Sequence, residues 1–291
     1  MNKKNAWSSA LVVIAVGTAA LSYPLQAQSA ESDEVLASAE SGSGLLHDRF
    51  IVSLGTFLLE TKTKVSVNGT AGAAATEVDL KRDLGFKDSD RFRVDGAWRF
   101  KNRHKLRMMY FNTSQERTKA LARDITVGDT VYPASASVTV KNETTVAELA
   151  YEYVFVMRPT YEVAGSAGIH SLKFKFQVSG TGTVNGVTGQ FSTETADTTA
   201  PLPVFGLRGL WEFSPQWYLE GMGQFFAIKY GDYDGHISDV RVGVTRMFGE
   251  HWGVGAGYNS FTTRLGVTKP SFDGELKWRY GGAMIFVTAA F

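Results

Sequence analysis

Apolar and polar residues alternate with a period of two along much of the chain, and this alternation constrains the fold more than any other feature. Between Trp217 and Ala227, one set of alternate positions is apolar or small, and the other set holds Glu220 and Gln224. Successive side chains of a β-strand point to opposite faces, so the pattern predicts strands with one apolar and one polar face. Similar patterns lie at residues 93–100, 147–155, 161–170, 205–213 and 252–259.

The ends of these segments favour a membrane barrel over a soluble β-sandwich, which would also alternate. No segment after the N-terminal region holds 18 consecutive apolar residues, so the sequence predicts no transmembrane helix. Aromatic residues gather at the segment ends, where a transmembrane barrel places its interfacial girdle. These residues are Trp98, Phe100, Tyr153, Phe155, Trp211, Phe213, Trp217 and Trp252.

The connections fall into two length classes, as in outer-membrane barrels with short periplasmic turns and longer outer loops. Nine connections join ten strands, so we expect an all-β fold consisting of a single transmembrane up-and-down antiparallel β-barrel of about 10 strands. Eight or twelve strands remain alternatives. Residues 76–87 are the least defined, either an extension of the second strand or a segment folded inward. The short connections are 101–104, 157–160, 214–216 and 249–251, and the longer ones are 68–75, 126–137, 179–200, 231–235 and 268–274.

The N-terminal region has the organisation of a secretory signal peptide. Lys3 and Lys4 precede an uncharged run, Ala10–Leu21, which is too short to span a bilayer as an anchor helix. Small residues follow, and cleavage after Ala27 or as late as Ala30 fits the pattern. We therefore expect a signal peptide at residues 1–27, a disordered periplasmic lead-in at 28–48, and an outer-membrane β-barrel at 49–291.

The end of the chain carries a family resemblance. Apolar residues alternate back from Phe291 through Val287 and Ile285, which resembles the C-terminal assembly signal of bacterial outer-membrane barrels. An alternating edge strand with an aromatic end suits capture by strand addition. The alternative is a soluble edge strand that happens to end in Phe. Stretches at 79–86, 98–104 and 233–235 resemble poorly characterised small outer-membrane proteins of Proteobacteria.

This resemblance implies a location in the bacterial outer membrane, reached by export through the cleaved signal peptide. It implies as partners the barrel-assembly machinery and periplasmic chaperones during biogenesis, and outer-membrane lipid and lipopolysaccharide afterwards. The formal net charge of +1 gives no indication of nucleic acid binding. Because cysteine is absent, disulfides, thiolate metal sites and cysteine nucleophiles are excluded, and the five scattered His indicate no zinc cluster. We expect no cofactor and no metal.

The inward-facing positions of the predicted strands carry charges of both signs. A ten-stranded barrel is only slightly wider than the eight-stranded kind, whose side chains fill the interior. Charges in such a lumen need partners, because desolvating an unpaired charge costs several kcal/mol. We therefore expect a closed, salt-bridged lumen with at most a narrow water path. The predicted network comprises Arg93, Asp95, Arg99, Arg107, Glu148, Glu152, Glu162, Arg208, Glu212, Glu220 and Arg241.

Two local patterns suggest hydrolytic chemistry. Asp88 and Asp90, facing Asp234 and His236, resemble the arrangement in omptins, ten-stranded outer-membrane proteases in which such groups activate a water. The alternative is ordinary turn chemistry, because Asp and Gly are common in loops. The pair His170-Ser171 suggests a lipid A deacylase, but neighbours on a strand point to opposite faces.

The expected function is therefore a non-enzymatic structural or surface-interaction role in the outer membrane. A narrow channel for small solutes is one alternative. An outer-membrane hydrolase, either omptin-like or a lipid A deacylase, is the other.

Overall fold

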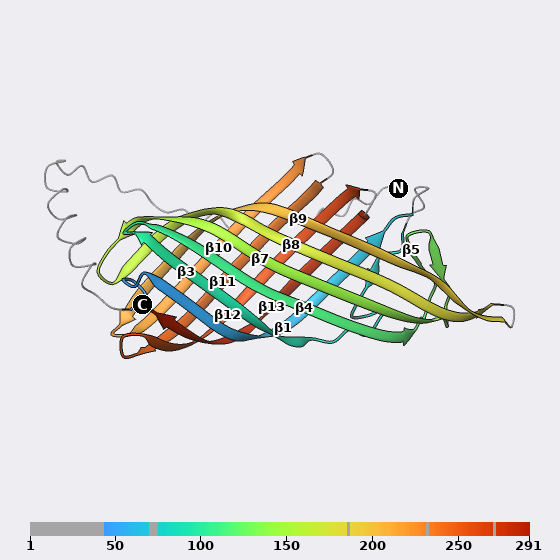
Figure 1. Ribbon diagram of the computed structural model, residues 1–291, viewed down its shortest axis with the longest axis horizontal. Coiled ribbons are helices and arrows are strands. Elements are labelled where there is room, and N and C mark those ends of the chain that lie inside the picture. The colour runs from blue at the N-terminus through green and yellow to red at the C-terminus, as the bar shows by residue number, and fades with distance from the viewer. Residues whose placement is uncertain (1–43, 70–74, 185–186, 231–232, 270–271) are drawn as a thin grey trace, which may run out of the picture.

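The computed structural model describes residues 44–69, 75–184, 187–230, 233–269 and 272–291, and this part of the chain is built from β-strands and their connections (Figure 1). The expected signal peptide and residues 28–43 lie outside the described residues. The strands are β1 (Phe50–Val67), β2 (Val78–Asp79), β3 (Ser89–Lys101), β4 (His104–Ala120), β5 (Ile125–Val127), β6 (Thr130–Tyr132), β7 (Ser137–Met157), β8 (Tyr161–Val184), β9 (Val187–Ser214), β10 (Trp217–Tyr230), β11 (Tyr233–Phe248), β12 (Trp252–Lys269) and β13 (Phe272–Ala290).

Ten of these strands form a closed antiparallel barrel. Each pairs with its neighbour in chain order, and β13 returns to pair with β1 from Ile51↔Ala290 to Val67↔Gly274. The two-residue strand β2 also joins this sheet, beside β1 beyond the point where β3 begins, and β5 and β6 form a separate two-stranded sheet. Closure leaves the wall without a free edge at the level where all ten strands are paired, which is the arrangement of transmembrane β-barrels. The predicted fold class and strand number are confirmed.

The two faces of each strand differ as the alternation requires. On β10, Trp217 and Phe225 are 40% and 57% exposed, whereas Tyr218 and Gln224 are buried inside the barrel. The same outward exposure of large apolar side chains recurs around the wall, from Leu54 on β1 to residues on β13. A protein that exposes this much apolar surface outside and buries polar groups inside is inverted relative to a soluble domain.

The exposed aromatic residues form two rings that bound this apolar band. The ring near the short turns contains Trp98, Phe155, Trp211, Trp217 and Trp252, among others. Trp217 and Phe225 are eight positions apart, or about 26 Å along a strand. With a tilt of about 40°, this corresponds to about 20 Å of height, close to the apolar band of outer-membrane barrels. The opposite ring contains Phe92, Tyr110, Phe205, Phe225 and Tyr258.

Beyond the second ring, the outward face becomes polar and the strands continue. On β8 the outward positions change from Ile169 to Lys173 and Lys175, both exposed. Figure 1 shows β8 and β9 extending far past the other strands. The connection predicted at 179–200 is therefore wrong for most of its length, since β8 and β9 run to Val184 and from Val187 as one long hairpin. Its Thr/Gly-rich composition resembles a loop because its outward face is polar.

The extension of β9 has one free side. Pairing with β10 ends at Phe225↔Phe205, while β9 continues through Pro203 and Pro201 paired only with β8. Proline has no N–H, so within sheets it is confined to edges and strand ends. The two prolines therefore fit the point at which the β9–β10 ladder stops.

Two insertions fill the outer half of the barrel. The segment at 76–87 folds inward: β2 pairs with Lys64 and Val65, and Leu80, Leu84 and Phe86 are buried in the main apolar cluster. In the region predicted as a long loop at 126–137, β5 and β6 form a hairpin whose residue Tyr132 is also buried there. Aromatic residues of the wall, including Phe111, Phe261, Trp278 and Tyr280, complete the cluster.

The last five residues of the expected disordered lead-in are ordered. Residues 44–48 form a turn in which the Asp48 carboxylate accepts the Gly44 backbone N–H at 2.9 Å. Leu45 and Leu46 are buried against Tyr218 and other residues at the short-turn end of the barrel. The expectation for 28–48 is therefore wrong for 44–48, because two adjacent leucines can bury apolar area inside the barrel mouth.

Two ion pairs of Glu77, called the latch below, hold the first insertion against the wall outside the apolar band. The Glu77 carboxylate pairs with the ammonium group of Lys64 on β1 at 2.7 Å and with that of Lys277 on β13 at 2.8 Å. These hydrogen bonds, first that of Lys277 and then that of Lys64, lower the pKa of Glu77 to about 2.

The latch predicts a specific pH dependence. Because the folded pKa of Glu77 lies below its usual value of 4.5, the stabilisation is complete above pH ~4.5 and disappears as the pH falls through about 2. NMR titration of the Glu77 carboxyl in lipid nanodiscs should give a midpoint near 2. The double variant Lys64→Gln/Lys277→Gln should return the midpoint towards 4.5, and an ordinary midpoint in the native chain would contradict the latch.

Candidate functional site in the barrel lumen

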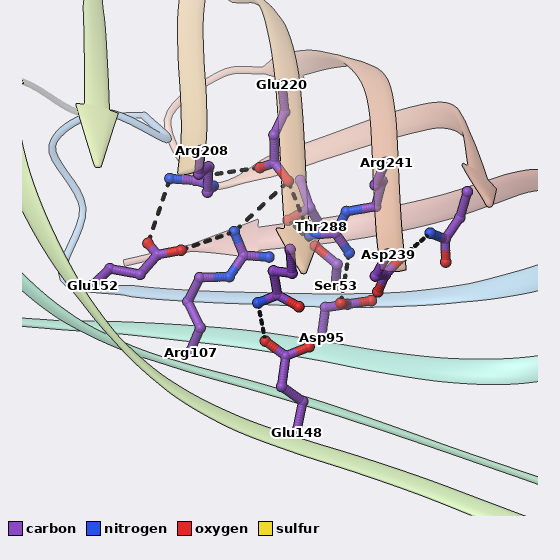
Figure 2. Close-up of polar contacts among 12 residues, drawn as sticks. Ser53, Asp95, Arg107, Glu148, Glu152, Arg208, Glu220, Asp239, Arg241 and Thr288 are labelled. Atoms are coloured by element: carbon purple, nitrogen blue, oxygen red, sulfur yellow. Dashed lines mark hydrogen bonds and ion pairs between the residues drawn. The ribbon is translucent and has the colours of Figure 1, made fainter. Parts of the chain in front are cut away.

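Charged side chains gather in the half of the lumen nearest the short turns, because the alternation of several strands points them inward. On β3 the positions 93, 95 and 99 share the inward face, and on β4 the positions 105 and 107 do. Acidic residues reach the same level from β7, β8 and β10. Figure 2 shows them converging from opposite sides of the barrel.

Glu162 is the centre of one half of this network. Its carboxylate is only 2% exposed and pairs with Arg99 at 2.9 Å, with Arg208 at 3.0 Å, and with Lys105. Arg99 also donates to the backbone carbonyls of Asn102 and Leu46, each at 2.7 Å. The ordered lead-in is therefore bonded directly to the charged lumen.

Glu220 joins this half to the other. It accepts from Arg208 at 2.9 Å and from Arg241 at 3.0 Å, and Figure 2 shows it between these two guanidinium groups. Arg241 continues to Asp95 at 2.8 Å, and Arg93 binds the same carboxylate through two parallel bonds of 2.8 and 2.9 Å. Bidentate pairs of this kind fix orientation as well as charge.

Arg107 lies more loosely between two carboxylates. Its guanidinium is 3.5 Å from Glu152 and 3.8 Å from Glu220, and Arg208 is 3.9 Å from Glu152. Each of these atom pairs is beyond a strong hydrogen bond but close enough for Coulomb attraction. This is the least constrained part of the network.

A cavity of about 80 Å³ opens beside these groups. Its lining includes Asp95, Arg107, Glu220 and Arg241, with Leu45 on the lead-in side and Phe286 on the wall. This space accommodates a few water molecules, which need polar partners of the kind present here. It is far smaller than a pocket for a drug-sized ligand.

A second polar layer separates the network from the apolar cluster. Glu148 accepts from Gln224 at 2.6 Å and lies 3.8 Å from His170, which is fully buried. Arg93 donates to Asn259 at 3.0 Å, and Asn259 in turn donates to Asp239. The His170 ring stacks on Phe261, with ring centroids 5.1 Å apart, so aromatic packing begins immediately above.

The two layers together balance charge. Counting these two layers in the part of the chain that the structure describes, six cations face six carboxylates. Such compensation is what a poorly solvated interior requires. The cations are Arg93, Arg99, Lys105, Arg107, Arg208 and Arg241, and the carboxylates are Asp95, Glu148, Glu152, Glu162, Glu220 and Asp239.

Of the residues expected in the lumen, nine join one connected set of ion pairs, Glu148 belongs to the second layer, and Glu212 stands apart. Glu212 accepts the Gln216 backbone N–H at 2.8 Å, at the turn between β9 and β10. Sequence reasoning missed Lys105 and Asp239. Lys105 shares the inward parity of Arg107, so the same alternation could have identified it. The nine are Arg93, Asp95, Arg99, Arg107, Glu152, Glu162, Arg208, Glu220 and Arg241.

The residues of the omptin-like hypothesis do not come together. Asp88 pairs with Lys81 at 2.6 Å, whereas Asp234 and His236 are exposed on the outward face of β11. Between β3, on which Asp90 lies, and β11 there are four inter-strand steps, or about 19 Å around the wall. The side chain of Asp90 itself is outside the described part. Asp88 accepts the Thr61 backbone N–H on β1 at 3.1 Å, and β1 is three inter-strand steps, or about 14 Å, from β11, too far for Asp88 and His236 to share a water.

The hydrolase pair His170-Ser171 is divided by the wall. His170 is buried in the lumen, while Ser171 has the opposite parity and faces outward. Among the described residues, no group of three or more His, Cys, Asp or Glu is positioned to hold a metal ion. In that same part of the chain, no helix has the length and hydropathy to cross a bilayer.

No protein-family model matches the chain, and no curated protein matches it. Among solved structures, the translocator domain of autotransporter NalP from Neisseria meningitidis is 12% identical, with a TM-score of 0.44 over 91% of this chain and 95% of that one. Ail, the attachment invasion locus protein of Yersinia pestis, is 11% identical, with a TM-score of 0.34 over 84% and 99%. The outer membrane protein AlkL is 11% identical, with a TM-score of 0.36 over 84% and 93%. These low scores support no conclusion about activity, and the fold rests on the strand pairing itself.

The network predicts very different costs for two Glu→Gln changes. Glu162→Gln leaves three buried cations without their shared carboxylate and should lower the free energy of unfolding by about 3–5 kcal/mol. Glu212→Gln should cost less than about 1 kcal/mol, since Glu212 holds no buried cation and an amide can keep its hydrogen bonds to the Gln216 backbone N–H and the Tyr218 hydroxyl. Urea unfolding of protein refolded into lipid vesicles measures both, and equal costs would show that the network is not a stabilising unit.

Proposed function

We propose that this chain spans the bacterial outer membrane as a non-enzymatic barrel with a closed lumen, and that its extended outer strands serve surface interactions. The main support for a closed lumen is that side chains fill the interior at three successive levels along the barrel axis. Leu45 and Leu46 fill the short-turn end, the paired charges fill the middle, and the aromatic cluster with its two insertions fills the outer half.

The exterior supports the membrane location. An apolar band between two aromatic rings is the surface that lipid requires, and above it the wall becomes polar on strands that continue outward. The expected export by a cleaved signal peptide, assembly by the barrel machinery with periplasmic chaperones, and contact with outer-membrane lipid and lipopolysaccharide belong to this proposal. Ile285, Val287 and Phe291 of the expected assembly signal are all outward-facing and exposed.

A narrow channel for small solutes is the second candidate. Its support is the cavity beside Arg107 and a vestibule of about 390 Å³ near the short turns, lined by His47, Arg49 and Lys101 among others. The aromatic cluster above them argues against a continuous path, because its members are almost completely buried.

The membrane location predicts a depth-dependent cost of charge on β1. Leu54 lies near the middle of the apolar band and Leu58 near its outer edge, and both are exposed. Leu54→Arg should destabilise the barrel in lipid vesicles by about 2–4 kcal/mol, and Leu58→Arg by about 0–1 kcal/mol. For a soluble protein both outward positions would tolerate Arg, so equal and small costs in urea unfolding would contradict the location.

The closed lumen predicts an absence of steady conductance. Purified full-length protein in a planar bilayer should give no large, lasting current, because paired charges and packed aromatic rings block the axis. The double variant Leu45→Ser/Leu46→Ser loosens only the short-turn end and should also remain closed. A large, steady conductance from the unaltered protein would favour the channel instead.

A further inference from the structure

The outward face of the wall carries two neighbouring cations without an ion-pair partner where the barrel closes, among the residues that the structure describes. Across the seam, Lys62 on β1 lies directly opposite Arg279 on β13, and Arg279 lies opposite Thr262 on β12. Lys62 and Arg279 are both exposed on the outer face. Like charges directly opposite each other in a sheet are destabilising, so an unpaired cationic pair of this kind is a cost that a ligand could offset.

In the next row outward along the β1–β13 seam, the cations do have carboxylate partners. Lys64 and Lys277 also face each other, but Glu77 bridges them at 2.7 and 2.8 Å. Arg264, which completes this row on β12, pairs with Glu275. Among the residues that the structure describes, Lys62 and Arg279 have no such carboxylate.

The depth of Lys62 and Arg279 matches that of lipid headgroups. Twelve positions separate Phe50 from Lys62 on β1, and twelve separate Arg279 on β13 from Phe291, the residue that follows β13. A tilted strand crosses the hydrocarbon in about 9–11 residues. Lys62 and Arg279 therefore lie just beyond the apolar band, with exposed Leu58 and Tyr258 two rows below them.

We infer that Lys62 and Arg279 bind the phosphate of an outer-leaflet lipid on the outside of the β1–β13 seam, an inference that rests on the membrane location proposed above. Arg and Lys both bind phosphate through charge-assisted hydrogen bonds, and Thr262 adds a hydroxyl in the same row. The acyl chains of this lipid lie along the apolar band, so the lipid contacts the two cations and the apolar band at once.

The wall below the cations is shaped to admit such a lipid. Gly281, one row lower, has no side chain, and the hydroxyl of Tyr258 lies 3.0 Å from where a Cβ would stand. Tyr258 therefore leans over the strand beneath Arg279 and presents an aromatic face with a polar tip, which is typical of interfacial residues. Glu60 is the acidic group nearest along β1, one row below Lys62 and opposite Gly281.

The test compares two double variants of the full-length protein, folded in a nonionic detergent. Lys62→Gln/Arg279→Gln removes the proposed site. Lys173→Gln/Lys175→Gln is the matched control: it removes two exposed outward lysines on β8, where Lys173 is also twelve positions from the inner end of its strand at Tyr161. Native mass spectrometry then measures the binding of bis-phosphorylated lipid A, dephosphorylated lipid A and inorganic phosphate.

The site variant should bind bis-phosphorylated lipid A about 30-fold more weakly than the unaltered protein, if each cation contributes about 1 kcal/mol at the membrane surface. The control should change affinity less than about threefold, and dephosphorylated lipid A should not distinguish the variants. Glu60→Gln should strengthen binding, because it removes a nearby negative charge.

Equal losses in the site and control variants would overturn the inference, because they would indicate non-specific attraction. Binding of inorganic phosphate as tight as that of the lipid would also overturn it, since the site would then serve a soluble anion. Membrane fractionation separates this inference from the proposed function. A site variant that fractionates with the outer membrane yet binds lipid normally refutes only the site, whereas native protein outside the membrane fraction refutes the location.

Discussion

The pairing of β13 with β1 is the constraint on which the other features depend. A sheet whose last strand returns to its first satisfies the backbone hydrogen bonds around the wall, which is the only way for strands to cross a bilayer. Closure with ten strands also fixes the interior volume. All inward-facing side chains must then fit within that volume, and every inward-facing charge needs an oppositely charged partner inside it.

The lumen meets this requirement differently at its two ends. Towards the short turns, cations from several strands share the carboxylates of Glu162 and Glu220, and Arg208 and Arg241 each pair with more than one carboxylate. Towards the outer side, the wall supplies aromatic rings, and the chain folds its own insertions between them. The boundary lies at His170 and Phe261, where a polar layer and an aromatic layer stack directly.

The period of two predicted most of this arrangement, since it determines both the strands and the faces of their residues. It identified the inward positions of Arg93, Glu162 and Arg241 without any knowledge of their partners. It could not show that Glu212 lies apart from this network, because the alternation predicts which face a side chain occupies but not its position along the barrel axis. It also failed at 179–200 and 44–48, where composition resembles a loop but the strand partner or the barrel mouth imposes order. Contacts between distant strands are not encoded in a local pattern.

The prolines of β9 affect how readily its unpaired edge could form a β-sheet with another molecule. Beyond Phe205, β9 has no strand partner opposite β8 among the described residues, so its backbone groups on that side are available to another strand. Sheets grow from one molecule to the next only where successive N–H donors are available. Pro201 and Pro203 interrupt that series at two alternate positions, so the edge next to the barrel is a poor template for another strand. The long strands can therefore leave the ten-stranded wall at a point where sheet growth from one molecule to the next is disfavoured.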